Sequence, residues 1–377
     1  MGFVGLILLV VADIQTEMNV DLAKYKPEDA KHIRYFNLEN VDNKDDYFAV
    51  VSFILNSIST SNTIVKPEFV NKDKTLIRFD LRDYKISLNN YAKIENDPLS
   101  KSPLMNVQWF IIKATITPNY YAVMGVSSLN DFHERHGHDP KKSLGEQAAV
   151  VISGKFTNNK RYLKRFPTLV GYLWEARSSE TTDYLRSLLS EDYDSLQVLA
   201  SNPNGLISYY IANDKGKPLN HISPKVAADT KTFEFDALVH ASRNCMVCHS
   251  SGIISFEDSV RAILKKEVQI FSPDEKVSLK LKGLFGDELP IVRDQKNYAK
   301  AVLEATDMEA KTVMEKYVSI WKNYYSDLTF TQVANLMGKT EEELEKLCKT
   351  SGDVRLVSLF LKGKISRVYF EQITEGK

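Results

Sequence analysis

The chain has few cysteines, no excess charge of either sign and no long apolar run, and each shortage excludes a class of protein. Three cysteines among 377 residues cannot build a disulfide framework, so a hydrophobic core must stabilise the fold. Lysine plus arginine total 49, as do aspartate plus glutamate, so we expect no nucleic-acid partner. No stretch approaches the roughly 20 apolar residues of a transmembrane helix, which predicts no transmembrane span.

Length and hydrophobic periodicity predict an α+β fold with two domains. The content of 43% hydrophobic and 26% charged residues is typical of a globular protein. Residues 16–232 mix helical periodicity, as at 45–57 and 183–189, with strand-like alternation, as at 75–81, and we interpret them as an α+β domain of unknown role. The apolar stretch 107–116 is compatible with a strand or a buried helix. Residues 233–377 show helical periodicity broken by glycine and proline, which predicts a mostly helical domain, and Thr340 with Glu343 predicts a capping box at the start of one of its helices.

The amino terminus is a short apolar segment, residues 1–15. Its apolar run is too short to span a bilayer and resembles the hydrophobic region of a secretory signal peptide. Val10 and Ala12 are small residues at a plausible cleavage site. The positively charged start of such a signal is missing, so a truncated signal and a buried strand are both open interpretations.

The most informative stretch is Cys245-Met246-Val247-Cys248-His249, because two cysteines two residues apart and followed by histidine form the attachment signature of haem c. Positions i and i+3 lie on one face of a helix, so both thiols can reach the vinyl groups of one porphyrin. His249 would then be the proximal ligand of the haem iron. Residues 233–377 are accordingly predicted to form a cytochrome c-like region with one covalent haem.

Two other readings of these residues are open. A zinc site needs four ligands, and Cys245, Cys248 and His249 supply three at most, because Cys348 stands far away without a second cysteine nearby. A redox-active dithiol or a disulfide is the other alternative, although no strand is predicted directly before the motif.

An electron-transfer haem normally has a second protein ligand, methionine or histidine. No histidine follows His249, so the candidates downstream are methionines. Met308 and Met314 are the candidate distal ligands, with Met308 slightly ahead because a helix could begin just before it. Met337 and His240 rank below them.

Two polar stretches could carry a further function. Residues 131–139 hold three histidines, His133, His136 and His138, which we interpret as a solvated polar loop, with a metal site or a distal haem ligand as alternatives. The basic segment 155–165 could dock an acidic redox partner or bind haem propionates, and a solvated surface is an equally good interpretation.

The sequence resembles a known family along much of its length. The most specific matches are residues 202–210 and 244–253, and shorter ones lie at 32–36, 55–59, 75–84, 109–110 and 172–174. These segments resemble the exported mono-haem c-type cytochrome-like proteins of Planctomycetes and related bacteria. The resemblance implies a redox role at the cell envelope and carries over only Cys245, Cys248 and His249 as haem residues. The chain departs from the family in being rich in lysine and in its weak signal sequence.

The sequence therefore predicts a mono-haem cytochrome that transfers electrons to or from a redox protein, in the periplasm or on the outer face of the envelope. A peripheral position on an envelope complex is one arrangement. The alternative is a haem enzyme or a sensor of peroxide or small gases, in which one side of the iron stays open. In that case residues 133–138 and 155–165 would line the distal pocket.

Overall fold

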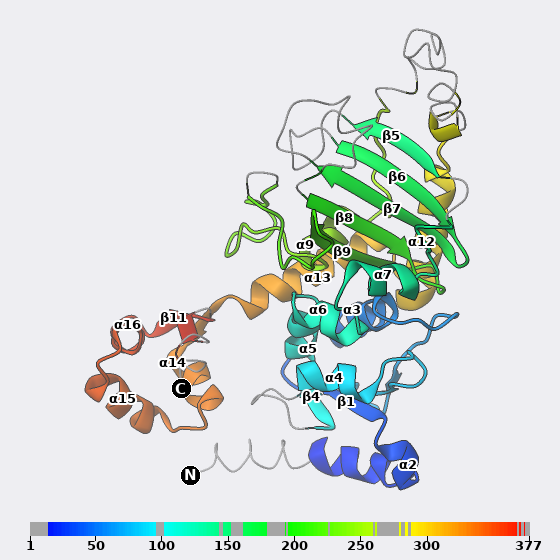
Figure 1. The fold of residues 1–377 in the computed structure, drawn as a ribbon. Helices are drawn as coiled ribbons and strands as arrows, with labels where there is room; N and C mark the ends of the chain where they lie inside the picture. The colour runs from blue at the N-terminus through cyan, green and yellow to red at the C-terminus, as the bar shows by residue number, and fades with distance from the viewer. Residues whose placement is uncertain are drawn as a thin grey trace. The chain divides into compact units, whose positions relative to one another are not determined.

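The computed structural model combines helices and sheets, which confirms the expected α+β class (Figure 1). The residues that it describes are 14–95, 102–142, 146–151, 161–178, 193, 195–224, 227–258, 261, 279, 283–285, 288–367, 369–370 and 373. Residues 1–13 of the apolar segment 1–15, and a helix expected at 183–189, lie outside them. Contacts divide the chain into two units, Met1–Lys316 and Tyr317–Lys377, a division that does not coincide with the boundary expected near residue 232.

The first part of unit one is a small mixed sheet with helices packed around it. Its strands are β1 (Ile33–Asn37), β2 (Glu68–Phe69), β3 (Leu76–Asp80) and β4 (Leu104–Asn106), in the order β2-β3-β1-β4. Its helices are α2 (Pro27–Ala30), α3 (Lys44–Ser57), α4 (Leu88–Glu95), α5 (Val107–Ala114), α6 (Asn119–Met124) and α7 (Leu129–Arg135). The alternation at 75–81 is confirmed as β3.

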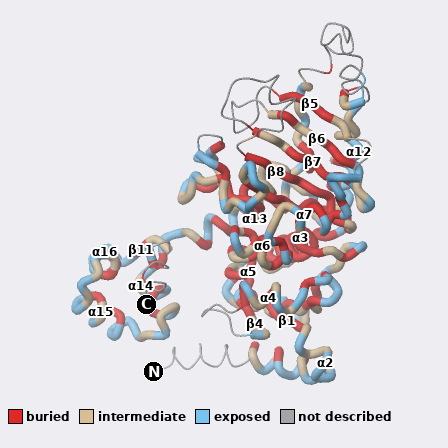
Figure 2. The backbone as a smooth tube through the Cα atoms, viewed as in Figure 1, coloured by how far each residue is buried: buried red, intermediate tan, exposed pale blue. Residues whose placement is uncertain are grey.

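Helix α3 shows how local sequence sets this packing. Asn43 caps it, because its side chain accepts a hydrogen bond from the Asp46 amide. Most of the helix is buried, with Val50, Ile54 and Leu55 wholly inaccessible (Figure 2). Residues 107–116 were equally compatible with a strand, and they form the buried helix α5 because Asn106 caps its first turn.

The second part of unit one is a five-stranded antiparallel sheet in which each strand pairs with the next along the chain. Its strands are β5 (Gln147–Val151), β6 (Arg161–Thr168), β7 (Gly171–Ser178), β8 (Ser195–Ser201) and β9 (Ile207–Asn213). Residues paired across neighbouring strands point to the same face of a sheet. The register thus places one row of side chains on what we call the cavity face: Arg161, Leu163, Arg165, Trp174, Ala176, Gln197, Leu199, Tyr209 and Ile211.

Helix α12 (Ile291–Thr306) packs on the cavity face of this sheet. The guanidinium of Arg165 in β6 donates two hydrogen bonds to the Asp294 carboxylate, at 3.0 and 3.1 Å, and both side chains are buried. The backbone carbonyl of Ala305 accepts a bond from the Ser52 hydroxyl of α3, which ties α12 to the first part of the unit. Helix α13 (Ala310–Tyr324) follows and runs across the division at Lys316.

Unit two is a small helical unit closed by a two-stranded ribbon. It contains β10 (Asp327–Thr329), α14 (Phe330–Leu336), α15 (Glu341–Thr350), α16 (Val354–Lys362) and β11 (Lys364–Ser366). The capping box predicted at Thr340 and Glu343 is confirmed at the start of α15. Cys348 is fully buried in the core of this unit, between residues such as Leu344 and Leu359. In the described part of the chain, every helix is too short or too polar to cross a bilayer.

Candidate functional site

The helix that carries the two cysteines, α9 (Arg243–Cys248), begins at a strained turn. Ser242 has φ 71° and ψ −70°, and the amide of Arg243 donates to the carbonyl of Ala241 at 3.0 Å, which defines a γ-turn. A residue other than glycine held in such a conformation costs about 1–3 kcal/mol, so the surrounding structure must hold the turn. The chain therefore enters the CxxCH motif in a fixed direction.

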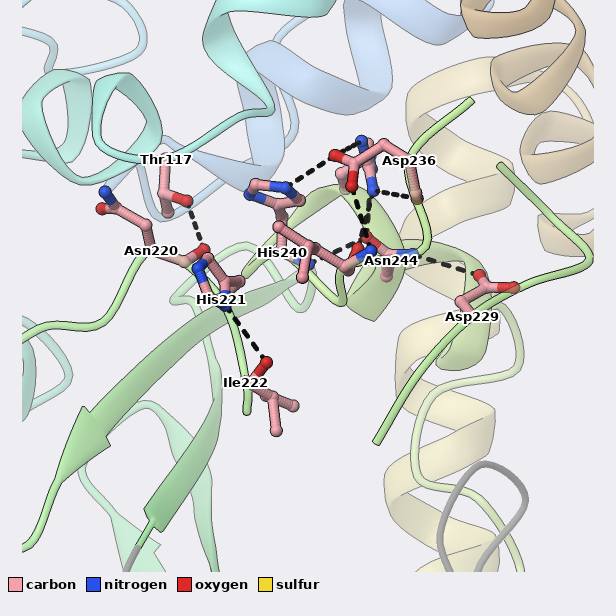
Figure 3. Close-up of polar contacts among 10 residues, drawn as sticks. Thr117, Asn220, His221, Ile222, Asp229, Asp236, His240 and Asn244 are labelled. Atoms are coloured by element: carbon pink, nitrogen blue, oxygen red, sulfur yellow. Dashed lines mark hydrogen bonds and ion pairs between the residues drawn. The ribbon is translucent and has the colours of Figure 1, made fainter. Parts of the chain in front are cut away.

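A buried polar network holds the segment before α9 in place (Figure 3). The Asn244 side chain donates to Asp229 at 3.1 Å and accepts from the His240 amide at 3.0 Å. The Asp236 carboxylate contacts Nε2 of His240 at 2.8 Å and accepts from the buried Arg243 guanidinium at 2.9 Å. Burial alone would raise the pKa of Asp236, but the hydrogen bond with His240 and the Arg243 charge outweigh burial and hold that pKa well below its usual range.

Cys245 and Cys248 lie one helical turn apart on α9, and no disulfide joins them. Both thiols are half-buried. Burial raises the pKa of the Cys245 thiol to about 11, which keeps it protonated at neutral pH although the Arg161 charge acts in the opposite direction. The Cys245 side chain is thus a neutral thiol, one helical turn before Cys248.

His249 follows the helix, and its ring is oriented by the backbone. Its Nδ1 lies 2.9 Å from the carbonyl oxygen of Gly252, so Nδ1 is the donor of this hydrogen bond, and Nε2 is the nitrogen that would face a metal. Gly252 has φ +85°, and a Cβ there would lie 3.2 Å from the ring of Tyr298. Glycine is therefore needed where the chain turns back past α12 to hold His249.

A cavity of about 880 Å³ opens beside α9, at the upper end of the range of cofactor cavities. Cys245 and His249 line it from one side, together with residues 253–257, whereas Cys248 is not among its lining residues. The other wall is the five-stranded sheet. Its cavity face contributes Val151, Arg161, Leu163, Trp174, Ala176, Gln197, Leu199, Tyr209 and Ile211, and Glu175, Val198 and Tyr210 of the opposite row also border the cavity. The attachment motif and a cofactor-sized space thus meet at one place.

Polar atoms without partners surround this cavity. Nε of Arg161, Nε1 of Trp174, Nε2 of Gln197 and the hydroxyl of Tyr209 are buried and make no hydrogen bond. An unsatisfied buried polar group costs about 1–3 kcal/mol, so four in one cavity indicate a space shaped for a group with polar edges. A porphyrin, which is flat, mostly apolar and carries two carboxylates, fits this lining and the Cys245 thiol beside it.

Within unit one, the structure does not bring the candidate distal ligands to this cavity. Met308, Met314 and His240 are absent from the described residues that line it. Met314 is buried within α13 and Met337 packs against the core of unit two. His240 is engaged with Asp236 instead.

The histidine-rich segment is not the solvated loop that its polarity suggested. His133, His136 and His138 are all buried, with at most 5% of each exposed. The reason is that α7 packs against the sheet on the face opposite the cavity, where the His138 ring lies 4.6 Å from that of Phe166. His136 is held between the carbonyl of Phe132 and the side chain of Asn202. The prediction of a solvated loop was wrong.

The basic segment also differs from a simple solvated surface. Residues 155–160 lie outside the described part of the chain, but residues 161–165 belong to β6. Arg165 is buried against Asp294, and Arg161 points into the cavity. Arg161 belongs to the segment that the sequence offered as a contact for haem propionates or a distal pocket, and it lines the cavity. Trp174, Gln197 and Tyr209 were not predicted as site residues, because only the strand register places them side by side.

Known proteins offer no guide to this site. No protein-family model matches the chain, and no curated protein or solved structure matches it either. The resemblance to the mono-haem cytochrome-like proteins stays a prediction.

Proposed function

We propose that the protein binds one haem c, attached through the thiols of Cys245 and Cys248, with His249 as the proximal iron ligand. The observation that carries this proposal is the cavity of about 880 Å³ that has Cys245 and His249 in its wall. The haem would supply a redox-active iron. In this proposal the chain anchors the group through two thiols, orients His249 through the Gly252 carbonyl and excludes water with the cavity face.

The proposed role is redox chemistry in the bacterial cell envelope, with a donor or acceptor protein as partner, as the sequence resemblance implies. The haem-binding region in this proposal differs from residues 233–377 taken alone. It combines α9 and residues 253–257 with the five-stranded sheet, because both sides contribute to the wall of the cavity.

One feature favours the second function, a haem enzyme or a sensor of peroxide or small gases, over a simple electron carrier. Apart from His249, the described residues that line the cavity include no histidine and no methionine. The sequence segments between residues 96 and 377 that are not described contain neither residue type. In this role the haem would supply the redox chemistry, and the buried donor atoms of Arg161, Gln197, Trp174 and Tyr209 would be the groups that hydrogen-bond to a small polar substrate in the cavity.

The test of attachment is production of the full chain together with a haem-maturation system, followed by denaturation. Haem that stays with the denatured wild type, and is lost from the Cys245→Ala/Cys248→Ala variant, would support the proposal. Cys348→Ala is the matched control, since this third cysteine lies in the core of unit two and should leave attachment unchanged. Absence of covalent haem in the wild type would overturn the proposal.

The native spectrum then separates the two roles. A high-spin spectrum, unchanged in Met308→Leu and Met314→Leu, would support an open site. A low-spin spectrum that becomes high-spin in one of these variants would establish a methionine ligand and the carrier role.

A further inference from the structure

A second cluster of chemically active side chains lies on the sheet face opposite the cavity. His133 in α7, His138 just after it and Glu175 in β7 are each at most 5% exposed. Their nearest ligand atoms all lie within 4.8 Å of one another. The His133 and His138 rings are 4.8 Å apart, and Nε2 of His133 lies 3.3 Å from the Glu175 carboxylate.

The hydrogen bonding of this cluster is incomplete. Nε2 of His138 is buried and makes no hydrogen bond, whereas Nε2 of His133 has the Glu175 carboxylate as its partner. His136, the third histidine of the same segment, has a partner for each ring nitrogen. A buried imidazole nitrogen without a hydrogen bond, next to a second imidazole that contacts a carboxylate, is the arrangement expected of a metal-binding triad, because an ion would satisfy the unpaired nitrogen.

We propose that His133, His138 and Glu175 bind a divalent transition-metal ion, with Zn²⁺ as the best match to two imidazoles and one carboxylate. This donor set is one that protein zinc sites use, and a water molecule or a further oxygen completes it. Ligand atoms of a tetrahedral Zn²⁺ lie about 3.3 Å apart. Closing the cluster therefore requires side-chain shifts of about 1 Å.

The surroundings support this assignment. Glu175 accepts a hydrogen bond from Arg177 at 3.0 Å, the kind of outer contact that orients a ligating carboxylate.

The proposed metal site shares no ligand with the CxxCH motif, so the test compares proteins with and without the two cysteines of that motif. The full chain is produced without an affinity tag, both as the wild type and as the Cys245→Ala/Cys248→Ala variant, and titrated with Zn²⁺ against a chromophoric chelator. One bound Zn²⁺ in both proteins is expected. Loss of binding in the double cysteine variant would place the metal at the CxxCH motif and overturn the proposal.

Variants of the cluster give the second readout. Glu175→Gln and His138→Gln should each weaken Zn²⁺ binding at least about 100-fold, since even outer contacts of a metal site are worth 10–100-fold. His32→Gln, a partly exposed histidine outside the cluster, is the control and should bind as the wild type does. Unchanged affinity in a folded Glu175→Gln variant would overturn the assignment.

A measurement on the wild type tests the metal site without relying on a variant that must fold. Zinc-edge X-ray absorption should show only nitrogen and oxygen ligands, with the scattering pattern of two imidazoles. Sulfur among the ligands, or a pattern without imidazole, would overturn the proposal. Zn²⁺ should also raise the melting temperature of the wild type, and absence of any bound metal would likewise refute the site.

Discussion

Replacing Arg165 with methionine tests how strongly α12 is held to the five-stranded sheet. The Arg165 and Asp294 side chains are only 5% and 2% exposed and share two hydrogen bonds. The change therefore leaves the buried carboxylate with only the exposed Arg293, 3.8 Å away, as a cation. Charge-assisted hydrogen bonds are worth about 1.5–3 kcal/mol each. Two of them give about 3–6 kcal/mol, close to the 3–5 kcal/mol measured when one partner of a buried ion pair is removed. We expect Arg165→Met to lose about 3–5 kcal/mol of unfolding free energy.

The assay is urea unfolding at neutral pH, followed by tryptophan fluorescence and circular dichroism. Arg165→Met/Asp294→Leu should recover much of the loss, because no unpaired charge stays buried. Lys349→Ala is the control: it breaks an exposed pair with Glu345 on α15 and should change stability by about 0.5 kcal/mol or less. A loss below about 1 kcal/mol in Arg165→Met would refute the argument that this pair is desolvated and essential to α12 packing.

Three further changes address the CxxCH segment. Gly252→Ala forces a side chain onto φ +85° within 3.2 Å of Tyr298, so we expect a loss of at least about 1 kcal/mol and a lower yield of attached haem, measured by urea unfolding and by haem content after denaturation. Ser242→Gly removes the γ-turn strain, which is about 1–3 kcal/mol, and adds the conformational entropy cost of glycine, which is about 0.5–1 kcal/mol. Because the strain is the larger of the two, we expect a higher urea midpoint. A lower midpoint would contradict the strain. Asp236→Asn should destabilise most above about pH 5. Because the folded-state pKa of Asp236 is depressed, its contribution is lost as the pH falls through that value, so urea midpoints of wild type and variant should converge in acid.

Local sequence patterns predicted much of the fold. The alternation in β3, the buried periodicity of α3 and the capping box at Thr340 each depend on neighbours within one or two turns, and all three are present in the structure. Residues 107–116 could not be assigned, because a short apolar run has no periodicity to separate strand from helix. In the structure this run begins with helix α5, whose first turn is capped by the Asn106 side chain.

The candidate site was predictable only where its residues are contiguous. Cys245, Cys248 and His249 form a recognisable spacing, but the wall of the cavity comes from five strands, and which of their side chains face it depends on pairing register. The sequence did not indicate Glu175 as a site residue, because a charged residue in an alternating strand usually faces solvent. His133, His136 and His138 were assigned to a solvated loop because their segment is polar, whereas packing against the sheet buries all three.

Strand β7 contributes to both proposed sites, because successive side chains of a strand point to opposite faces of the sheet. Trp174 and Ala176 face the cavity, and Glu175, between them, faces His133 and His138. A single inserted or deleted residue near the start of β7 would exchange these faces, turning a carboxylate into the apolar cavity and an indole toward the histidines. Substitutions can alter either site alone, but a change of strand length there would abolish both together, so the spacing within residues 171–178 is expected to tolerate no insertions.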